Sequence, residues 1–466
     1  MFRHHSRVAG TLVSLAAGTL AAALASAAVP ALAAVPALAA QQTLAAQISV
    51  SPTPASGTPQ LAPNGKVEQV RQLVKCGTRM YAVGSFTKIS QGTQVFTRRN
   101  AFSFRATAPY TVSNWRPGVN GEVNSIAFKH GHCRSAYLGG TFTRVHGTRA
   151  RNIVKVNTST GAVRKRFARR ADNTVETIVV HRRHVLVGGF FKSINRSGRN
   201  YYASLNSRTG HDDRYLRLHV SGHYSFPGVQ PNRTRIYNQQ LSPLGRRLLV
   251  EGDFTRVHRT HREQIFMLRL RRTRARVTRW RSAEFFGSCA DSEPFYVHAA
   301  SWSPDSSTIY IAANGFKPFN NSSSAPRTGL CDAASAFPSG NRKVHHKWIN
   351  YTGCDSLFST AADSSTAFFG GHERWADNPD GCNVAGPGAI SAVGMGGFVP
   401  STGALLLNSG GTAGLYSRSR GLGADDMLIT SQGLWIASDN FDADVTGFDK
   451  CGGQSGHAGI CLLPNA

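Results

Sequence analysis

Short apolar stretches of four to eight residues, several of them with alternating polar positions, recur along the chain from residue 64 onward. Five copies end in small residues followed by an aromatic residue: MYAVGSFTKI at Met80, AYLGGTFTRV at Ala136, VLVGGFFKSI at Val185, LLVEGDFTRV at Leu248 and IYIAANGFKPF at Ile309. Two weaker copies, AFFGGHERW at Ala367 and LWIASDNF at Leu434, bring the number to seven. The pattern therefore predicts seven repeats of strand-forming units.

Each unit contains further strand-like stretches around this template. An apolar stretch precedes it, as in VEQVRQLV from Val67, and another follows it, as in RNIVKVN from Arg151. A turn with a Thr-Gly pair comes next, and several units close on a short stretch that contains Trp115, Trp280 or Trp348. Four short strands repeated seven times, without helical periodicity, predict an all-β, seven-bladed β-propeller of four-stranded antiparallel blades.

The repeated residues have structural explanations in such a fold. Gly139 and Gly140 lack a Cβ and let strands approach closely, and Phe142 is expected to pack between blades. Gly161 supplies a hairpin bend. A phosphate-binding loop places its glycines between a strand and a helix, whereas this template leads into a Phe and another strand. It therefore does not predict a nucleotide site.

The stretch from Gly139 to Val163, GGTFTRVHGTRARNIVKVNTSTGAV, resembles the delta-sixty repeat of secreted bacterial, especially actinobacterial, β-propellers of unassigned function. The first three units match the repeat well, the fourth is good, and the last three diverge and carry long insertions. The resemblance covers roughly Asn64 to Pro464 and implies the propeller fold and export. It supplies no catalytic residues for this chain.

The N-terminal 40 residues have the pattern of a secretory signal peptide, because Arg3 and Arg7 precede a long uncharged run rich in Ala and Leu. An uncleaved membrane anchor is the alternative, since the run is long enough to span a bilayer. We expect a monomeric, secreted or cell-wall-associated protein, without a transmembrane segment once the signal is removed.

The rest of the chain divides into a Pro/Ser/Thr-rich arm, residues 41–63, and a single β-propeller domain, residues 64–466. The last repeat shows only three strands. The sequence therefore predicts that the arm, near Ile48, supplies the missing outer strand of the last blade.

Eight cysteines in an exported chain indicate disulfide bonds. Equivalent turns of neighbouring repeats predict the pair Cys76–Cys133. Equivalent places after the Trp stretch predict Cys289–Cys354, insertions after the template of units five and six predict Cys331–Cys382, and the remaining pair, Cys451–Cys461, closes a local loop. A zinc site is the alternative, but no Cys and His residues cluster at zinc-binding spacing. Disulfides between repeats are expected to hold neighbouring blades together.

Two acidic stretches are candidates for chemistry. Asp439, Asp442 and Asp444 lie in SDNFDADVTGFD, whose oxygen donors can encircle Ca²⁺, although the stretch departs from the EF-hand pattern and a plain acidic loop is the alternative. His372 and Glu373 lie in GGHERWADNPDGC, which we interpret as a polar surface insertion. The sequence predicts no other cofactor and no catalytic residue.

The formal charge of +28 is concentrated in one part of the chain. Between Lys129 and Arg281 there are 33 Lys and Arg residues against 7 Asp and Glu residues. A region this basic can attract a polyanion. Candidate contacts are Arg144, Arg149, Arg151, Arg271, Arg272, Arg274 and Arg276. Codon bias, and charges that discourage edge pairing of outer strands, are the alternatives.

A binding or scaffolding module outside the cell is the favoured function, with an extracellular protein, a glycan or a cell-wall polyanion as partner. A glycan hydrolase or lyase is the alternative from another class, and it requires Asp or Glu residues from several repeats at the central channel. Adhesion to a polyanion through the basic blades, residues 129–281, is the third possibility.

Overall fold

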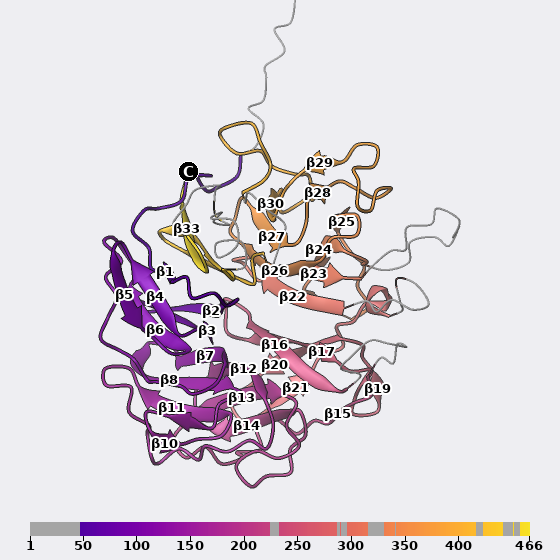
Figure 1. Ribbon diagram of the computed structural model, residues 1–466. Coiled ribbons are helices and arrows are strands. Elements are labelled where there is room, and N and C mark those ends of the chain that lie inside the picture. The colour runs from indigo at the N-terminus through magenta and orange to yellow at the C-terminus, as the bar shows by residue number, and fades with distance from the viewer. Residues whose placement is uncertain are drawn as a thin grey trace, which may run out of the picture. The chain divides into compact units, whose positions relative to one another are not determined.

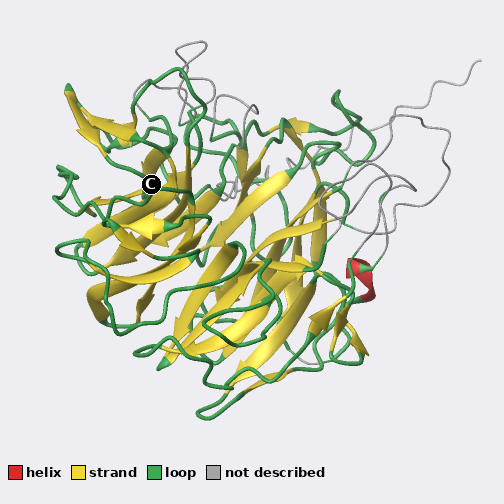
Figure 2. Cartoon of the chain, turned by 60° about the horizontal axis from the view of Figure 1, so that its bottom comes forward, coloured by secondary structure: helices red, strands yellow, loops and turns green. Residues whose placement is uncertain are grey.

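The computed structural model describes residues 47–223, 233–286, 289, 296–315, 330–340, 342–415, 423–440, 451 and 457–466. Within the compact unit Ala45–Ala466 these residues form β-sheets, and the one helical element in the described ranges is the 3-10 helix η1 at Ala283–Phe285 (Figure 2). No helix in this part of the chain is long and apolar enough to cross a bilayer. The predicted signal peptide lies outside the described residues.

Seven antiparallel sheets form the blades, and we number them in chain order. From the innermost strand outward, blade 1 contains β2 (Gln69–Cys76), β3 (Arg79–Ser85) and β6 (Ala101–Arg105); blade 2 contains β7 (Val123–Lys129), β8 (His132–Gly140) and β11 (Ile153–Asn157); and blade 3 contains β12 (Val175–His181), β13 (His184–Gly189) and β14 (Tyr202–Asn206). Blade 4 contains β16 (Arg235–Leu241), β17 (Arg247–Asp253), β20 (Ile265–Leu270) and β21 (Ala275–Val277).

Blade 5 contains β22 (Tyr296–Trp302), β23 (Thr308–Asn314), β24 (Ala333–Pro338) and β25 (Trp348–Tyr351); blade 6 contains β26 (Leu357–Ala362), β27 (Ala367–Gly371) and β30 (Met395–Phe398); and blade 7 contains β31 (Asp426–Thr430), β32 (Gly433–Ala437) and β33 (Ile460–Pro464). Small sheets join β1 (Gln60–Leu61), β4 (Lys88–Gln91) and β5 (Gln94–Thr97); β9 (Arg144–Val145) and β10 (Thr148–Arg149); β15 (Val220–Ser221), β18 (Arg256–Val257) and β19 (Thr260–His261); and β28 (Trp375–Ala376) and β29 (Ile390–Ser391).

The seven innermost strands close a ring. Strand β2 contacts β7, and the series continues through β12, β16, β22, β26 and β31, which contacts β2 again. Figure 1 shows this circuit, in which the colour runs round the centre from indigo to yellow and β33 of the last blade lies beside β1 of the first part. The chain therefore folds as a seven-bladed β-propeller, as the repeats predict.

The outer strand of the blades varies in regularity. Blades 4 and 5 have four regular strands, whereas single antiparallel bridges hold a fourth segment in blades 1, 2, 3 and 6. In blade 7 the segment beside β33 comes from the arm. Ser51 N donates to Pro464 O over 2.8 Å, and Ala55 N donates to Leu462 O over 2.9 Å. That the ring requires the arm for its closure stays a prediction.

The repeated template residues pack as the sequence predicts. The template phenylalanines among the described residues are at most 1 % exposed: Phe86, Phe142, Phe191 and Phe254. A Cβ on Gly140 would overlap the carbonyl oxygen of Glu122, which lies directly before the neighbouring strand β7. Gly161 has φ of +77° in its turn, a conformation that favours glycine.

Three tryptophans join each of three blades to the next one. Their indole N–H groups donate to carbonyl oxygens at or just beyond the third strand of the following blade, each over 3.0 Å: Trp115 to Asn157, Trp280 to Pro338 and Trp348 to Pro400. Of the three, only Trp348 lies in a regular outer strand, whereas Trp115 and Trp280 lie just beyond the last strand of their blades. These bonds therefore connect neighbouring blades at the rim of the ring.

All eight cysteines form disulfides, but two of the four predicted pairs are wrong. Cys76–Cys133 joins blades 1 and 2, and Cys451–Cys461 closes a loop in blade 7, as expected. The other bonds are Cys289–Cys331 and Cys354–Cys382, in place of Cys289–Cys354 and Cys331–Cys382. These four cysteines lie in long insertions and connections, so the repeat register does not fix which of them meet.

Candidate functional site

The innermost strands share a distortion that directs side chains into the channel. In six of them the pairing with the second strand shifts by one residue, so that one extra residue opposes no partner. In the seventh, Asp425 lies directly before β31 and its N–H donates to Ala437 O, next to the Asp426–Ala437 pair. Such β-bulges re-aim a side chain and recur next to functional sites.

The six bulge residues and Asp425 all line one cavity of about 450 Å³ at the centre of the ring. They are seven different residues: Arg71, Asn124, Glu176, Tyr237, His298, Phe358 and Asp425. The template positions, in contrast, repeat the same residue types from blade to blade. The propeller scaffold explains the repeated bulge but not this set of side chains, which makes the cavity, hereafter the channel pocket, the candidate site.

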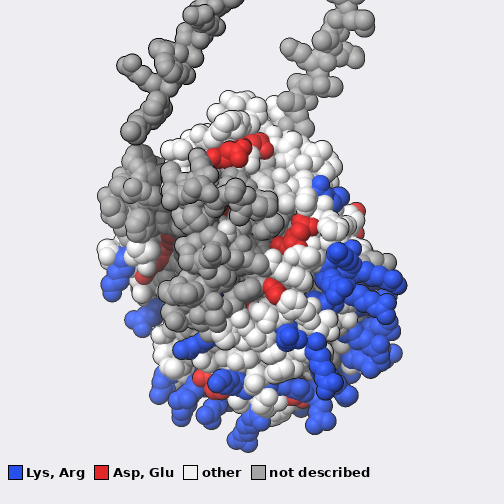
Figure 3. All heavy atoms as spheres, turned by 90° about the vertical axis from the view of Figure 1, so that its right-hand side faces the viewer, with Lys and Arg blue, Asp and Glu red and all other residues white. Residues whose placement is uncertain are grey.

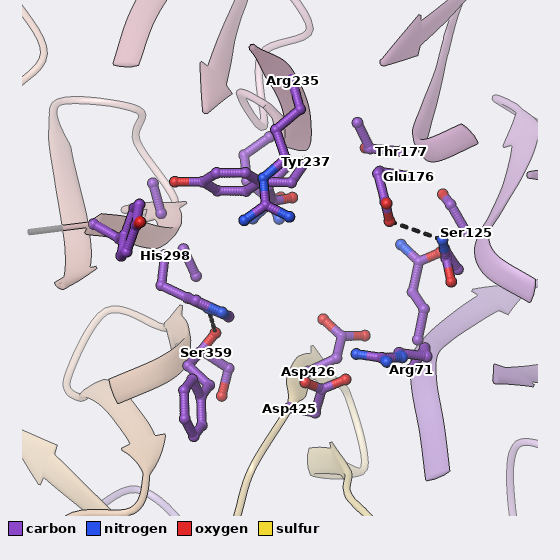
Figure 4. A pocket seen from close by; sticks show the side chains of 18 of the residues that line it. Arg71, Ser125, Glu176, Thr177, Arg235, Tyr237, His298, Ser359, Asp425 and Asp426 are labelled. Carbon is purple, nitrogen blue, oxygen red and sulfur yellow. Dashed lines mark hydrogen bonds between the residues drawn. The ribbon is translucent and has the colours of Figure 1, made fainter. Parts of the chain in front are cut away.

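One wall of the channel pocket holds a cation among carboxylates. Arg71 Nε donates to Glu122 Oε1 over 2.7 Å, and Figure 4 shows the Arg71 side chain reaching toward Asp425 and Asp426. Burial lowers the pKa of Arg71, but the nearby carboxylates of Asp425 and Glu122 outweigh burial and raise it. The arginine is therefore held in its charged form by acids from blades 2 and 7.

Three carboxyl groups of the channel pocket, those of Asp425, Asp426 and Glu176, retain protons more readily than free side chains. Burial raises the pKa of Asp425 to about 6, partly opposed by Arg71, and raises the pKa of Asp426 to about 7. Burial likewise raises the pKa of Glu176, whose carboxylate accepts a hydrogen bond from Asn124 Nδ2 over 2.7 Å. Near neutral pH the pocket thus holds both protonated and ionised carboxyl groups.

The opposite wall combines a second cation with aromatic rings. The Arg235 guanidinium lies 5.3 Å from the centre of the Phe190 ring and 5.2 Å from that of Tyr237, and its Nε is buried without a hydrogen-bond partner among the described residues. His298 Nδ1 is 2.9 Å from Phe358 O, and burial lowers the pKa of His298 to about 4. At neutral pH this histidine is therefore uncharged.

Side chains next to the bulges connect neighbouring inner strands. Ile126 N donates to Gln72 Oε1 over 2.7 Å, and Ile178 N donates to Ser125 Oγ over 3.1 Å. Across the junction of the last and first blades, Leu73 N donates to Asp426 Oδ2 over 2.9 Å. These bonds fix the strands that present the channel side chains, so the pocket is preorganised.

The predicted polyanion contacts are on the surface but do not form one cluster. Arg144 and Arg149 lie on the hairpin β9–β10 of blade 2 and Arg151 follows it, whereas Arg271, Arg272, Arg274 and Arg276 lie in or beside β21 of blade 4. All seven are exposed. Figure 3 draws one face of the molecule, on which Lys and Arg side chains gather over the lower and right-hand parts, whereas most Asp and Glu side chains lie higher and a few lie among the basic ones. Arg271 and Arg276 line a separate pocket in blade 4.

The two acidic stretches singled out in the sequence differ in how far the structure describes them. Asp442 and Asp444 lie outside the described residues, and Asp439 is buried with its backbone bridged to Gln69. No group of three His, Cys, Asp or Glu residues in the described ranges could hold a metal ion, and the calcium site stays a prediction. The interpretation of His372 and Glu373 as surface residues is wrong for Glu373, which is 2 % exposed. Burial raises the pKa of this carboxyl well above its usual range.

No protein-family profile matches the chain, and no curated protein matches its sequence. The structure is similar to that of Sqt1 from Saccharomyces cerevisiae, with a TM-score of 0.45 and 10 % identity over 88 % of this chain and all of that one. It is also similar to a putative 6-phosphogluconolactonase from Bacteroides uniformis, with a TM-score of 0.43 and 12 % identity over 80 % and 90 % of the two chains. A third similar structure is that of BamB from Moraxella catarrhalis, with a TM-score of 0.38 and 10 % identity over 83 % of this chain and 97 % of that one. These distant likenesses carry no argument about function.

Proposed function

We propose that this protein is an extracellular binding module whose channel pocket holds a small polyhydroxylated ligand, such as one or two sugar units of a glycan. The observation that supports the proposal is the set of bulge positions: seven blades contribute seven different side chains to one preorganised cavity. The pairing of all eight cysteines is compatible with an oxidising, extracellular environment.

The chemistry of the channel pocket suits sugar hydroxyl groups. Carboxylate and amide groups of Glu176 and Asn124 can accept and donate hydrogen bonds, and the Arg235 donors are held in place by two aromatic rings. The rings of Tyr237 and Phe358 offer apolar faces among these polar groups. A volume of about 450 Å³ lies within the range of small-ligand pockets.

The test is a screen of the mature protein against immobilised glycans, followed by calorimetry with the soluble form of each glycan retained. Replacing Phe358 by Leu and Asn124 by Ala should each weaken binding by about 10-fold, because each removes one direct contact. Lys88→Gln, at an exposed position on β4 that lines neither the channel pocket nor the pocket of blade 4, is the control and should leave affinity unchanged. Absence of any retained glycan, or equal affinity of the channel variants, would refute the proposal.

A second candidate is a glycan hydrolase or lyase that uses the channel carboxyl groups. The observation in its favour is the convergence of Glu122, Glu176, Asp425 and Asp426 from blades 2, 3 and 7 on one cavity. The raised pKa values of Asp425 and Asp426 make a protonated acid available near neutral pH, while Glu122 lies beside Arg71.

Prolonged incubation of a bound glycan with the protein separates the two functions. Hydrolysis releases new reducing ends and a lyase forms unsaturated sugars, and Asp425→Asn should abolish either product while it retains glycan binding. If a glycan binds in the channel pocket and is recovered intact, the enzyme function is excluded and the binding function remains.

A further inference from the structure

A second pocket, of about 600 Å³, lies between the outer strands of blade 4 and the β24–β25 connection of blade 5. It shares no lining residue with the channel pocket. Six exposed arginines line it, and none of its described lining residues is Asp or Glu: Arg246, Arg269, Arg271, Arg276, Arg279 and Arg342. We call this site the arginine pocket.

Three arginines stand in a row across adjacent strands of blade 4. Arg247 on β17 pairs directly with Arg269 on β20, which pairs directly with Arg276 on β21. Directly opposed residues share one face of a sheet, and like charges in such positions destabilise it. Protection against edge-to-edge association requires charge on the edge strand β21 alone. The row is therefore not explained by edge protection.

The inner end of the arginine pocket is fixed by hydrogen bonds. Arg247 Nη1 donates to Ser339 O over 2.7 Å, its Nη2 donates to Ser306 O over 2.8 Å, and its guanidinium lies 5.1 Å from the centre of the Trp302 ring. Arg281 N donates to Arg342 O over 2.7 Å and so ties the blade 5 connection to blade 4. The walls that carry the exposed guanidinium groups are thereby held together.

We propose that the arginine pocket binds the sulfate or phosphate ester groups of an anionic glycan. Guanidinium groups form paired hydrogen bonds with such oxyanions, and a bound polyanion would relieve the repulsion along the row. Nucleobase recognition uses exposed aromatic rings for stacking, but the one aromatic residue among the described lining residues, Trp280, is 2 % exposed. A recess of this size admits a substituted sugar unit rather than the side of a duplex.

The experiment measures binding of the mature protein to a heparin octasaccharide and to a phosphomannan fragment, as sulfated and phosphorylated probes. The pocket variant replaces Arg269, Arg271 and Arg276 by Gln. A matched control replaces Arg144, Arg149 and Arg151 by Gln on blade 2, so that both proteins lose the same charge. The pocket variant should lose about 10- to 100-fold in affinity, and the control less than about threefold.

Both variants alter exposed side chains, and their melting temperatures should be equal to or above that of the parent protein. The ranking of the two probes identifies the favoured ester. Equal losses in the two variants would show diffuse attraction and overturn the proposal, as would the absence of binding to both probes by the parent protein. Tighter binding of duplex DNA through the same three arginines would assign the pocket to nucleic acid instead.

Discussion

The channel pocket and the arginine pocket both contain arginines, but the channel pocket balances its positive charge with carboxyl groups, whereas the described lining of the arginine pocket does not. In the channel, Arg71 bonds to Glu122 and lies among further carboxyl groups from blades 2, 3 and 7. In the arginine pocket none of the described lining residues is acidic, and six guanidinium groups face water. The difference is one of degree of burial: Arg71 is partly shielded from water and bonds to a partner within the protein, whereas water stabilises the exposed guanidinium groups.

This contrast predicts two kinds of selectivity. A mixed and partly neutral set of groups in the channel selects a ligand by the pattern of its hydroxyl and amide groups, with weak dependence on salt. The exposed single-sign set in the arginine pocket selects by charge, and its affinity should fall steeply as salt screens the attraction. The two pockets should therefore respond differently to changes in ring closure, charge and pH.

Removal of the arm is expected to have the largest effect, and it should affect the channel most. Ile48 and Val50 are 2 % and 3 % exposed and pack against blades 6 and 7, so their loss should cost about 3–6 kcal/mol of stability. For a domain of this length the melting temperature should fall by about 5 °C. Calorimetry of a protein that begins at Pro59 measures this.

The matched control is a shorter truncation that begins at Gln47 and keeps the contacts of Ile48, Ser51 and Ala55. The channel pocket includes Asp425 of blade 7, whereas the arginine pocket is built from blades 4 and 5. Heparin affinity should thus survive the long truncation better than glycan binding in the channel. An unchanged melting temperature would show that the arm does not close the ring.

Loss of an arginine should distinguish the two pockets by stability alone. Arg71→Met leaves Glu122 and Asp425 without their cation, and we expect a loss of about 1–2 kcal/mol, since the arginine side chain is partly exposed. Arg269→Met removes an exposed charge from a row of like charges and should have little effect or stabilise the fold. Urea unfolding of both variants at neutral pH gives the comparison. Equal losses would contradict the difference in charge balance.

The fold could be predicted from the sequence because its determinants repeat. Phe142 and its equivalents, the paired glycines and the tryptophans recur at one place in the unit, and each has one packing role. The disulfides of blades 5 and 6 could not be assigned in this way, because Cys289, Cys331, Cys354 and Cys382 lie in long, divergent insertions and connections, where the repeat register does not fix which cysteines meet.

The sequence contains a signal for the channel residues, but it lies in the inner strand and not in the glycine and phenylalanine template. Six of the seven channel residues directly follow an apolar residue near the start of their inner strand, as in Val70-Arg71, Val123-Asn124, Val175-Glu176 and Val297-His298. Alignment of the repeats at this position would have shown a variable column directly after a column of apolar residues. The sequence predicted only some of the arginines that line the arginine pocket, among them Arg271 and Arg276. Arg342 could not be included, because it comes from blade 5 and meets blade 4 only through the tertiary fold.

The smallest effect we predict is a change in pH dependence from one channel carboxyl. Burial raises the pKa of Asp426 to about 7 in the folded protein, above the unfolded value of about 3.9. The folded state therefore binds this proton more tightly, so the contribution to stability is present at low pH and is lost as the pH rises through about 7. Asp426→Asn keeps an acceptor for Leu73 N but cannot ionise.

Between about pH 6 and pH 8, parent stability should fall by about 1 kcal/mol relative to Asp426→Asn, measured by urea unfolding at several pH values. Burial also raises the pKa of Asp253, Glu263 and Asp332 to about 7, but these groups are present in both proteins and cancel in the difference. Asp305→Asn is the control. Hydrogen bonds from Ser303 and Ser307 lower the pKa of Asp305 to about 2, so its charge is constant over this range. If the free energy of unfolding changes with pH in the same way in the parent and in Asp426→Asn, the channel wall is hydrated enough to keep Asp426 ionised. The charged groups of the two pockets would then differ less in burial than we infer.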